Sequence, residues 1–465
     1  MNRFIFLVLP LLAMVGCGSS SNPGTQRTDA ASTATIDDPI ERGLIDIVHA
    51  SPDAPNVNVW FDGIKRLSNI RYKGAASWFE EESSTSVEVE AILPGTNAVV
   101  IGPGDIMVKQ GSRTTVIALN KVNSIEPLVL MTPIDQISTT ETQVRVVHGA
   151  PNVGMVDVYV TQPGIDLSTT AALGTFEFKG TLGPISVPAG IYQVRVTPAG
   201  DPDTVAYTAD IELTGGNDVV AVAVENTSFG QSPISLVASI TSPDAGDSYI
   251  VADVLDTSTK ARIRTVHVSP DAPVVDIFAN NDFSAPLFDA LSYSEFTKYL
   301  EVPTGPTNIK VLPDGLSAPS AASAVIDADV TLQAGNSYSV YATDVVATLQ
   351  PLLLTDDNRP VGTEARVRLI HGSPTAGAVD IYVVGAGADI TDVSPTFADI
   401  PFRAETGYVP LATGDYDVVV TPAGSKDSAI YAAISLENGK IYTAVARDGF
   451  GGGGPLGLTL MDDFE

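Results

Sequence analysis

The chain of 465 residues is poor in three residue types, with one cysteine, four histidines and two tryptophans. A single cysteine, Cys17, excludes an intramolecular disulfide, so packing and hydrogen bonds must stabilise the fold. Basic residues are scarce as well, since 25 Lys and Arg oppose 55 Asp and Glu and leave a net charge of −30. A surface this acidic repels phosphate backbones and anionic headgroups, which argues against nucleic acid and against electrostatic lipid binding.

The N-terminus reads MNRFIFLVLPLLAMVGCGSS. Its uncharged stretch from Phe4 to Gly16 is shorter than the ~20 residues of a membrane-spanning helix, which predicts a signal peptide. Gly16 before Cys17 resembles the bacterial lipoprotein signal, in which the cysteine is lipidated and binds the membrane through its acyl chains. By that resemblance, Gly18 implies sorting to the outer membrane or cell surface. The alternative is an ordinary secretory signal with a chance cysteine.

The rest of the chain predicts several all-β domains. Hydrophobic residues make up 44% of the sequence, which is enough to form cores, and single cores stop growing near ~250–300 residues. Valine, threonine, glycine and proline recur, while helix-forming runs are scarce. This composition favours short strands joined by turns.

Each histidine opens a version of one phrase, at spacings of roughly 100 to 120 residues, close to the size of an immunoglobulin-like sandwich. The first and third copies share SPDAP, whereas the second and fourth share a glycine after the histidine and a later TPAG. The repeat predicts tandem immunoglobulin-like β-sandwich modules in A-B-A-B order. The four phrases are VHASPDAPNVNVW at His49, VHGAPNVGMVDVY at His148, VHVSPDAPVVDIF at His267 and IHGSPTAGAVDIY at His371.

The composition along the chain predicts the domain boundaries. A Ser, Thr and Gly-rich stretch after the cysteine indicates a flexible tether, and a second polar stretch separates the two halves. The expected parts are a lipoprotein signal peptide and lipobox over 1–17, the tether over 18–43, module 1 over 44–140, module 2 over 141–242, a linker over 243–261, module 3 over 262–360 and module 4 over 361–465.

The repeated phrase, together with the later P-A-G and G-x-Y and a closing P-L-x-L, resembles a bacterial extracytoplasmic family, the domain of unknown function DUF4397. The resemblance covers nearly everything after the tether. It implies a secreted or lipid-anchored protein and carries no activity.

Strand alternation places the histidines on the apolar face of each first strand, beside residues such as Ile45 and Ile47. We therefore expect a structural role for all four, with ring nitrogens bonded to turn backbone such as that of Ser51 or Ser269. The alternative is a metal ligand or a general base. One histidine per module, with no thiol besides the lipidated one, does not supply three or four metal ligands, so we expect no metal, cofactor or catalytic residue.

The opposite strand face carries a charge pattern. Arginine stands three residues before the histidine in modules 2 to 4, and aspartate stands nine residues after it, whereas module 1 has Asp46 and Asn58 at these positions. The pattern predicts cross-strand ion pairs worth at most ~1 kcal/mol each if exposed. The predicted pairs are Arg145 with Asp157, Arg264 with Asp276 and Arg368 with Asp380.

These features predict a non-enzymatic surface protein whose tandem modules bind or adhere to a polysaccharide or a surface protein. The alternative is a spacer of the envelope or surface layer without a ligand of its own. The third alternative is an enzyme, for which the sequence shows no nucleophile, paired-acid or cofactor signature.

Overall fold

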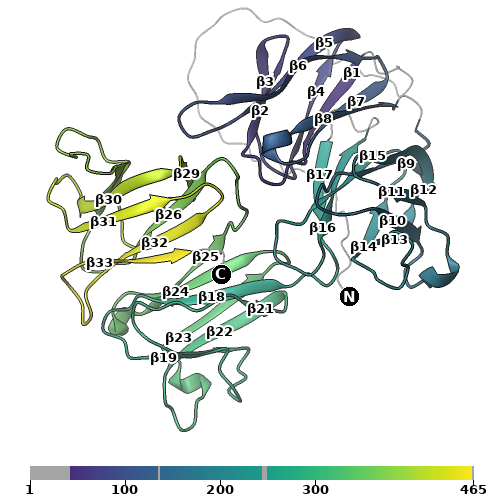
Figure 1. Ribbon diagram of the computed structural model, residues 1–465. Coiled ribbons are helices and arrows are strands. Elements are labelled where there is room, and N and C mark those ends of the chain that lie inside the picture. Colours follow the sequence, from purple (N-terminus) through teal and green to yellow (C-terminus); the bar gives the residue numbers. More distant parts are fainter. Residues whose placement is uncertain (1–41, 135–136, 243–248, 463–465) are drawn as a thin grey trace, which may run out of the picture.

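The computed structural model describes residues 42–134, 137–242 and 249–462. The predicted signal peptide, Cys17 and the predicted tether up to residue 41 lie outside these residues. The described residues form strands, turns and short 3-10 helices, and none of their helices is long and apolar enough to span a membrane. The chain is a string of β-sandwich modules, as the repeat predicts (Figure 1).

Modules 1 and 2 each consist of two facing sheets. In module 1 these are β4-β1-β7-β8 and β3-β2-β5-β6, and in module 2 they are β12-β9-β15-β16-β17 and β11-β10-β13-β14. The strands of module 1 are β1 (Gly43–His49), β2 (Val57–Phe61), β3 (Ile64–Ile70), β4 (Ala75–Glu80), β5 (Ser83–Ala91), β6 (Ala98–Val108), β7 (Ser112–Leu119) and β8 (Glu126–Pro133), with η1 (Val122–Ser124). Those of module 2 are β9 (Glu141–His148), β10 (Val156–Thr161), β11 (Gly174–Phe176), β12 (Thr181–Pro188), β13 (Gly190–Pro198), β14 (Tyr207–Leu213), β15 (Asp218–Glu225), β16 (Ile234–Thr241) and β17 (Tyr249–Val254), with η2 (Leu167–Thr169).

Modules 3 and 4 repeat this arrangement. Their sheets are β21-β18-β24-β25 with β20-β19-β22-β23, and β29-β26-β32-β33 with β28-β27-β30-β31. The strands of module 3 are β18 (Ala261–His267), β19 (Val275–Ala279), β20 (Phe288–Leu291), β21 (Leu300–Val302), β22 (Gly305–Pro313), β23 (Ile326–Leu332), β24 (Ser337–Thr343) and β25 (Gln350–Asp356), with η4 (Ala321–Ser323) and η5 (Val346–Thr348). Those of module 4 are β26 (Ala365–His371), β27 (Val379–Gly385), β28 (Phe397–Ile400), β29 (Val409–Leu411), β30 (Gly414–Pro422), β31 (Ile430–Leu436), β32 (Ile441–Arg447) and β33 (Gly457–Asp462).

Each module begins with the strand that ends in the repeated histidine, and this first strand pairs in parallel with a strand near the module's end. The parallel pairs are β1 with β7, β9 with β15, β18 with β24, and β26 with β32. The next strand, after the Pro- or Gly-containing turn, belongs to the other sheet. The turn therefore crosses from one sheet of the sandwich to the other.

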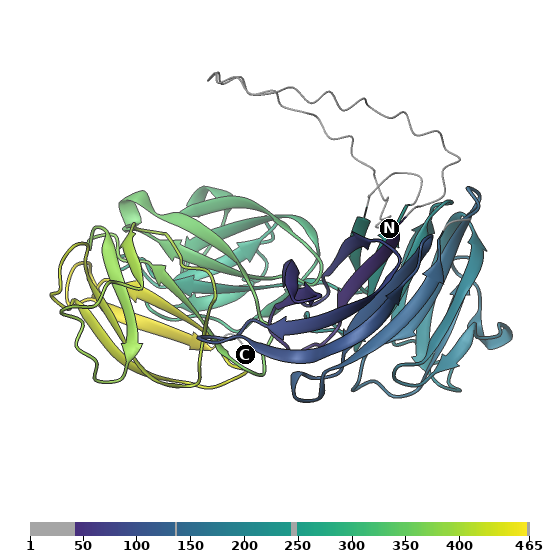
Figure 2. The ribbon, with the colours of Figure 1, turned by 90° about the horizontal axis from the view of Figure 1, so that it is seen from above.

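The modules pack in two pairs through the sheets that hold their first strands. An apolar cluster with Val48 and Ile117 of module 1 and Val147 and Val222 of module 2 joins the first pair. A second cluster, with Val266 and Tyr341 of module 3 and Ile370, Val445 and Met461 of module 4, joins the second pair. First strands such as β1 are buried on both faces for this reason. Figures 1 and 2 show the two pairs side by side.

The linker predicted over 243–261 requires a correction. Its residues Tyr249–Val254 form β17, which pairs antiparallel with β16 and extends the sheet of module 2. The residues after β17 also hold to module 2, because Thr257 N–H donates to the Thr208 carbonyl and Thr208 N–H to the Asp256 carboxylate. The valine and isoleucine of YIVADV are typical of a strand, but the Ser, Asp and Gly residues around them favoured the prediction of a linker.

Candidate functional site

The four histidines have the same geometry in every module. In module 1, His49 is buried, its Nε2 lies 2.9 Å from the Pro55 carbonyl, and its Nδ1 lies 3.4 Å from Ser51 N–H. His148, His267 and His371 bond the carbonyl six residues on and the N–H two residues on in the same way. With Nε2–H as donor and Nδ1 as acceptor, each neutral ring holds the turn that crosses between the sheets.

Burial disfavours the charged form of three of these rings, those of His49, His267 and His371. It lowers the pKa of His49 to about 4 and also lowers the pKa of His267 and of His371. A proton on Nδ1 would also displace the backbone N–H that this nitrogen accepts. The rings are thus arranged as neutral structural groups, with both nitrogens occupied by backbone.

An aromatic ring meets each histidine edge-on: Tyr72, Phe178, Tyr293 and Phe402, at centroid distances of 6.0 to 6.5 Å. In modules 1 and 3 this ring is a tyrosine, and its hydroxyl reaches the neighbouring module. Tyr72 donates to the Glu225 carbonyl and Tyr293 to the Asp448 carbonyl, both at a distance of 2.6 Å. Modules 1 and 3 thus have a tyrosine that contacts the neighbouring module, whereas modules 2 and 4 have a phenylalanine at this place. This alternation follows the A-B-A-B order of the repeat.

The predicted cross-strand arginine–aspartate pairs are wrong in all three modules. Arg264 lies on β18 and Asp276 on β19, and these strands belong to different sheets of the sandwich; the same holds for Arg145 with Asp157 and for Arg368 with Asp380. The aspartates bond turn backbone instead: Asp157 accepts from Gly200 N–H, Asp276 from Ala290 N–H, and Asp380 from Asp399 N–H and Gly424 N–H.

The arginines face the inter-module interface. In the first pair, Arg145 reaches Thr132 Oγ1 of module 1 at 3.2 Å. A fully buried arginine of module 1, Arg113, bridges Asp46 of its own module at 2.5 Å and Asp218 of module 2 at 2.9 Å. Burial opposes the charged guanidinium, but the two carboxylates outweigh it and raise the pKa of Arg113.

The second pair has an equivalent cluster with the charges reversed. Asp356 of module 3 lies 2.5 Å from Arg368 Nη2 of module 4 and 3.9 Å from Arg264 Nε of its own module. Ser339 and Tyr299 donate further bonds to the Asp356 carboxylate. All three charged groups are buried.

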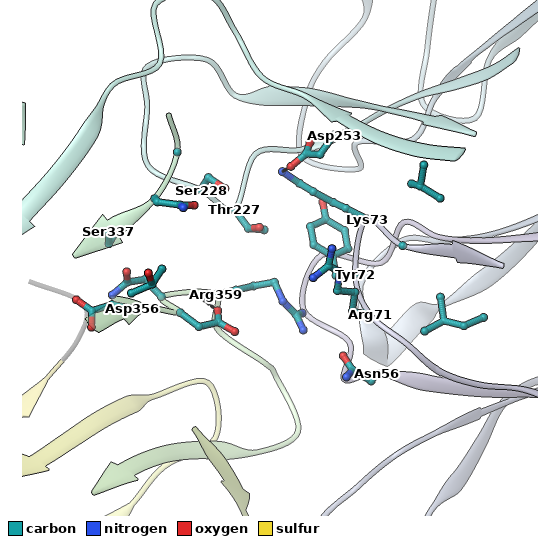
Figure 3. A pocket seen from close by; sticks show the side chains of 18 of the residues that line it. Asn56, Arg71, Tyr72, Lys73, Thr227, Ser228, Asp253, Ser337, Asp356 and Arg359 are labelled. Atoms are coloured by element: carbon teal, nitrogen blue, oxygen red, sulfur yellow. Dashed lines mark hydrogen bonds and ion pairs between the residues drawn. The ribbon is translucent and has the colours of Figure 1, made fainter. Parts of the chain in front are cut away.

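A cavity of about 860 Å³ lies where the two pairs meet (Figure 3). Its walls come from module 1 (56 and 68–76), module 2 (227–229, 251 and 253), module 3 (262, 335–337 and 355–357), the connection 358–359 and module 4 (366). Arg359 helps to join the two pairs, because its Nη1 donates to the Ala54 carbonyl at 2.8 Å and its guanidinium lies over the Tyr72 ring. All four modules contribute to this cavity.

The cavity is a positively charged region of an acidic molecule. Five cationic side chains line it against three carboxylates, namely Arg71, Lys73, Arg262, Arg359 and Arg366 against Asp253, Asp356 and Asp357. Lys73 pairs with Asp253 at 3.1 Å and Arg366 with Asp357 at 2.7 Å. Burial still lowers the pKa of Lys73 and of Arg359. An anion in the cavity would relieve this cost, because it favours the charged forms of both groups.

The sequence reasoning missed this cavity. Its one local signal is Arg71-Tyr72-Lys73, two cations around an aromatic in a chain with few cations. Arg359 lies almost 300 residues further along the chain, and no spacing rule connects it with Tyr72.

Module 3 contains the one group of three converging carboxylates among the described residues. Oxygens of Asp276, Asp289 and Asp314 lie within 4.8 Å of one another. Burial, and then repulsion by the two neighbours, raises the pKa of Asp276.

The repeated histidine phrase, on which the family resemblance rests, occurs once in each of the four β-sandwich modules. The model of the domain of unknown function DUF4397 matches residues 43–159 and 261–382. These stretches together make up more than half of the chain, which therefore belongs to this family. Each begins at the first strand of an A-type module and ends within the second strand of the B-type module that follows.

Solved structures give low similarity. The Bacillus anthracis TIE protein is 11% identical over 88% of this chain and 68% of its own, with a TM-score of 0.15. A family 41 carbohydrate-binding module structure from streptococcal virulence factors, described as recognising alpha-glucan, is 14% identical over 43% and 96%, with a TM-score of 0.16. The pilus adhesin SpaC from Lactobacillus rhamnosus GG is 9% identical over 92% and 53%, with a TM-score of 0.15. No curated protein matches the chain. At these values, the likeness identifies no ligand.

Proposed function

We propose that this chain is a non-enzymatic binding protein of the bacterial cell envelope, and that its central cavity takes an acidic segment of a polysaccharide. The observation that carries the proposal is the gathering of five cationic side chains in one cavity of a chain whose net charge is −30. The low-dielectric walls of a cleft focus the electric field of the charges that line it, and this field attracts anions.

The polar lining suits a sugar. Beside the charged groups, the cavity presents side chains that can donate and accept hydrogen bonds, including Asn56, Asn69, Ser228 and Asn336, and it offers the ring of Tyr72. Figure 3 shows Arg359 and Arg71 near Tyr72. Guanidinium groups bind carboxylate or sulfate in two-point contacts, and polar side chains can bond hydroxyls.

A role as an enzyme is not part of the proposal. Both ring nitrogens of every histidine are engaged by backbone, which leaves no free imidazole as a base. The cavity holds neither cysteine nor histidine.

Titration calorimetry of the purified chain with acidic and neutral polysaccharides tests the cavity. We expect acidic chains alone to bind, with Arg71→Glu reducing the affinity at least tenfold. Lys109→Glu is the matched control, because it makes the same charge change at an exposed site outside the cavity and should leave the affinity within about twofold. Equal losses of affinity in both variants would show that binding depends only on the overall charge of the chain. If the chain bound no polysaccharide, the result would favour a spacer without a ligand of its own.

The proposal includes a lipid anchor on Cys17 at the outer membrane or cell surface. Changing Cys17 to serine removes the acylated thiol, so we expect the protein to move from the detergent phase to the aqueous phase on phase partition of cells. Wild-type protein that remains aqueous would indicate an ordinary secretory signal.

A further inference from the structure

The sandwich of module 2 is hollow. A cavity of about 290 Å³ lies between its two sheets and is lined from both of them, by residues such as Val146 of β9, Val158 of β10, Val194 of β13 and Ala221 of β15. It is separate from the central cavity, with which it shares no lining residue.

The matching positions of the other modules are closed. Val144 and Val146 of module 2 are partly exposed, although the repeat places them on the core face. Their counterparts in the other modules are at most 4% exposed: Ile45 and Ile47 in module 1, Ile263 and Thr265 in module 3, and Val367 and Leu369 in module 4.

The strand register explains the difference. The core residue four positions before each histidine has one paired neighbour on each side, and in modules 1, 3 and 4 one of the two is aromatic. The neighbours are Trp78 and Thr114 in module 1, Leu300 and Tyr338 in module 3, and Val409 and Tyr442 in module 4. In module 2 they are Ile185 and Val219. Without a ring at this level, the space between the sheets stays open.

The cavity opens along one edge of the sandwich. The exposed lining residues are Leu173, Ser186 and Pro188. Ser186 and Pro188 belong to β12, and Leu173 directly precedes β11, a strand of three residues. β11 and β12 are edge strands of the two facing sheets, so the mouth lies between them.

The lining defines the chemistry of the ligand. It contains no charged side chain, and its polar side chains are His148, which bonds backbone through both nitrogens, Tyr192, whose hydroxyl donates to the Pro188 carbonyl, and Ser186, which lies at the mouth. The lining runs over four residue steps of β9, from Val144 to His148, which is ~13 Å of strand. A slot of this length between two sheets fits a straight chain better than a bulky ring system.

We propose that module 2 binds an unbranched alkyl or acyl chain of about ten to twelve carbons, with the head group at the mouth between β11 and β12. A dry apolar cavity of ~150 Å³ holds benzene, so roughly twice that volume accommodates roughly twice the carbon count. Burial of methylene groups supplies the affinity.

Titration calorimetry of the purified chain with 1-decanol, decanoate and a ten-carbon lysophospholipid tests this proposal. We expect saturable binding of one decanol per chain and no saturable binding of 1-butanol. Binding of the lysophospholipid as well would identify a lipid tail as the source, whereas binding of decanol and decanoate alone would identify a free chain. Absence of saturable binding for all three ligands would overturn the proposal.

Two variants test whether the ligand binds in the cavity of module 2. Ile185→Trp installs the residue of module 1, Val219→Tyr installs the residue of modules 3 and 4, and each should reduce decanol affinity at least tenfold. Val409→Trp makes the matched change in module 4 and should leave it within twofold. Unchanged binding in whichever of the two variants remains folded, or a loss in Val409→Trp alone, would show that the chain does not bind in this cavity. Arg71→Glu should leave decanol binding unchanged, which separates this test from that of the central cavity.

Discussion

The two module pairs bury charge at equivalent interfaces with opposite arrangements. Between modules 1 and 2, one arginine, Arg113, lies between the carboxylates of Asp46 and Asp218. Between modules 3 and 4, one carboxylate, Asp356, lies beside the guanidinium groups of Arg264 and Arg368. Both interfaces therefore hold complementary charges in contact, although different strand positions carry each sign.

The comparison also explains the exception in module 1. Where modules 2, 3 and 4 have arginine before the histidine, module 1 has Asp46, and the arginine that compensates for it comes from the neighbouring strand β7. Asn58, which stands where the other modules have aspartate, bonds Glu90 and Asn69 in the other sheet.

The largest expected effect is that of removing the central arginine of the first pair. Arg113→Leu leaves Asp46 and Asp218 buried together without the cation that bridges them, which should cost about 3–5 kcal/mol of the free energy of unfolding. Chemical denaturation of the variant measures it. Adding Asp46→Asn and Asp218→Asn should recover most of the loss. A loss below about 1 kcal/mol would mean that this cluster contributes nothing particular to docking.

Acid should destabilise the first pair through His49. The pKa of this histidine is about 4 in the folded chain and near ~6.5 in the unfolded chain, so the unfolded state binds more protons between these values. The stability contribution, about 3 kcal/mol, is complete above pH ~6.5 and is lost as the pH falls towards 4. Denaturation midpoints from pH 7 to pH 4 should fall less steeply in His49→Gln than in the wild type. Parallel slopes would contradict the assignment.

Asp356→Asn gives the counterpart in the second pair. It removes the Asp356 carboxylate beside Arg264 and Arg368, but Arg264 keeps Ser339, Arg368 keeps Thr443, and each lies over a tyrosine ring. We therefore expect a loss of about 2 kcal/mol, smaller than that of Arg113→Leu. Chemical denaturation of both variants under one set of conditions decides this ranking. A larger loss in Asp356→Asn than in Arg113→Leu would show that the second interface depends more strongly on its central charge than the first.

The smallest effects should be equal in the two pairs. Tyr72→Phe and Tyr293→Phe each remove one hydroxyl that donates to a carbonyl of the next module, at a cost of about 1 kcal/mol. Equal losses would show that this docking contact is equivalent in the two pairs, unlike the charged clusters. A clear inequality would show that the two interfaces differ here too.

Much of the fold could be predicted from the repeat, because strand period and turn residues are local. The alternation that put Ile45 and Ile47 on one face also put His49 beside them, and all three are buried. The arginine–aspartate pairs failed because alternation tells which face of a strand a residue occupies, but not which sheet the next strand joins.

The central cavity could not be predicted, because its walls are set by the docking of modules far apart in sequence. Arg359 reaches Tyr72 only after two pairs have formed and met. The hollow in module 2 depends on a missing ring at one level of the sandwich, and that level is defined by strand register, which the sequence alone does not specify.

The parallel pairing of the first strand in every module sets an order of assembly. Leu44 pairs with Arg113, and Ile263 with Tyr338, so the first strand of a module must wait until most of that module has been synthesised. Such distant pairings close slowly. The outer face of the first strand is covered only when the other module of its pair has folded as well, so the unit that completes folding is the pair of modules.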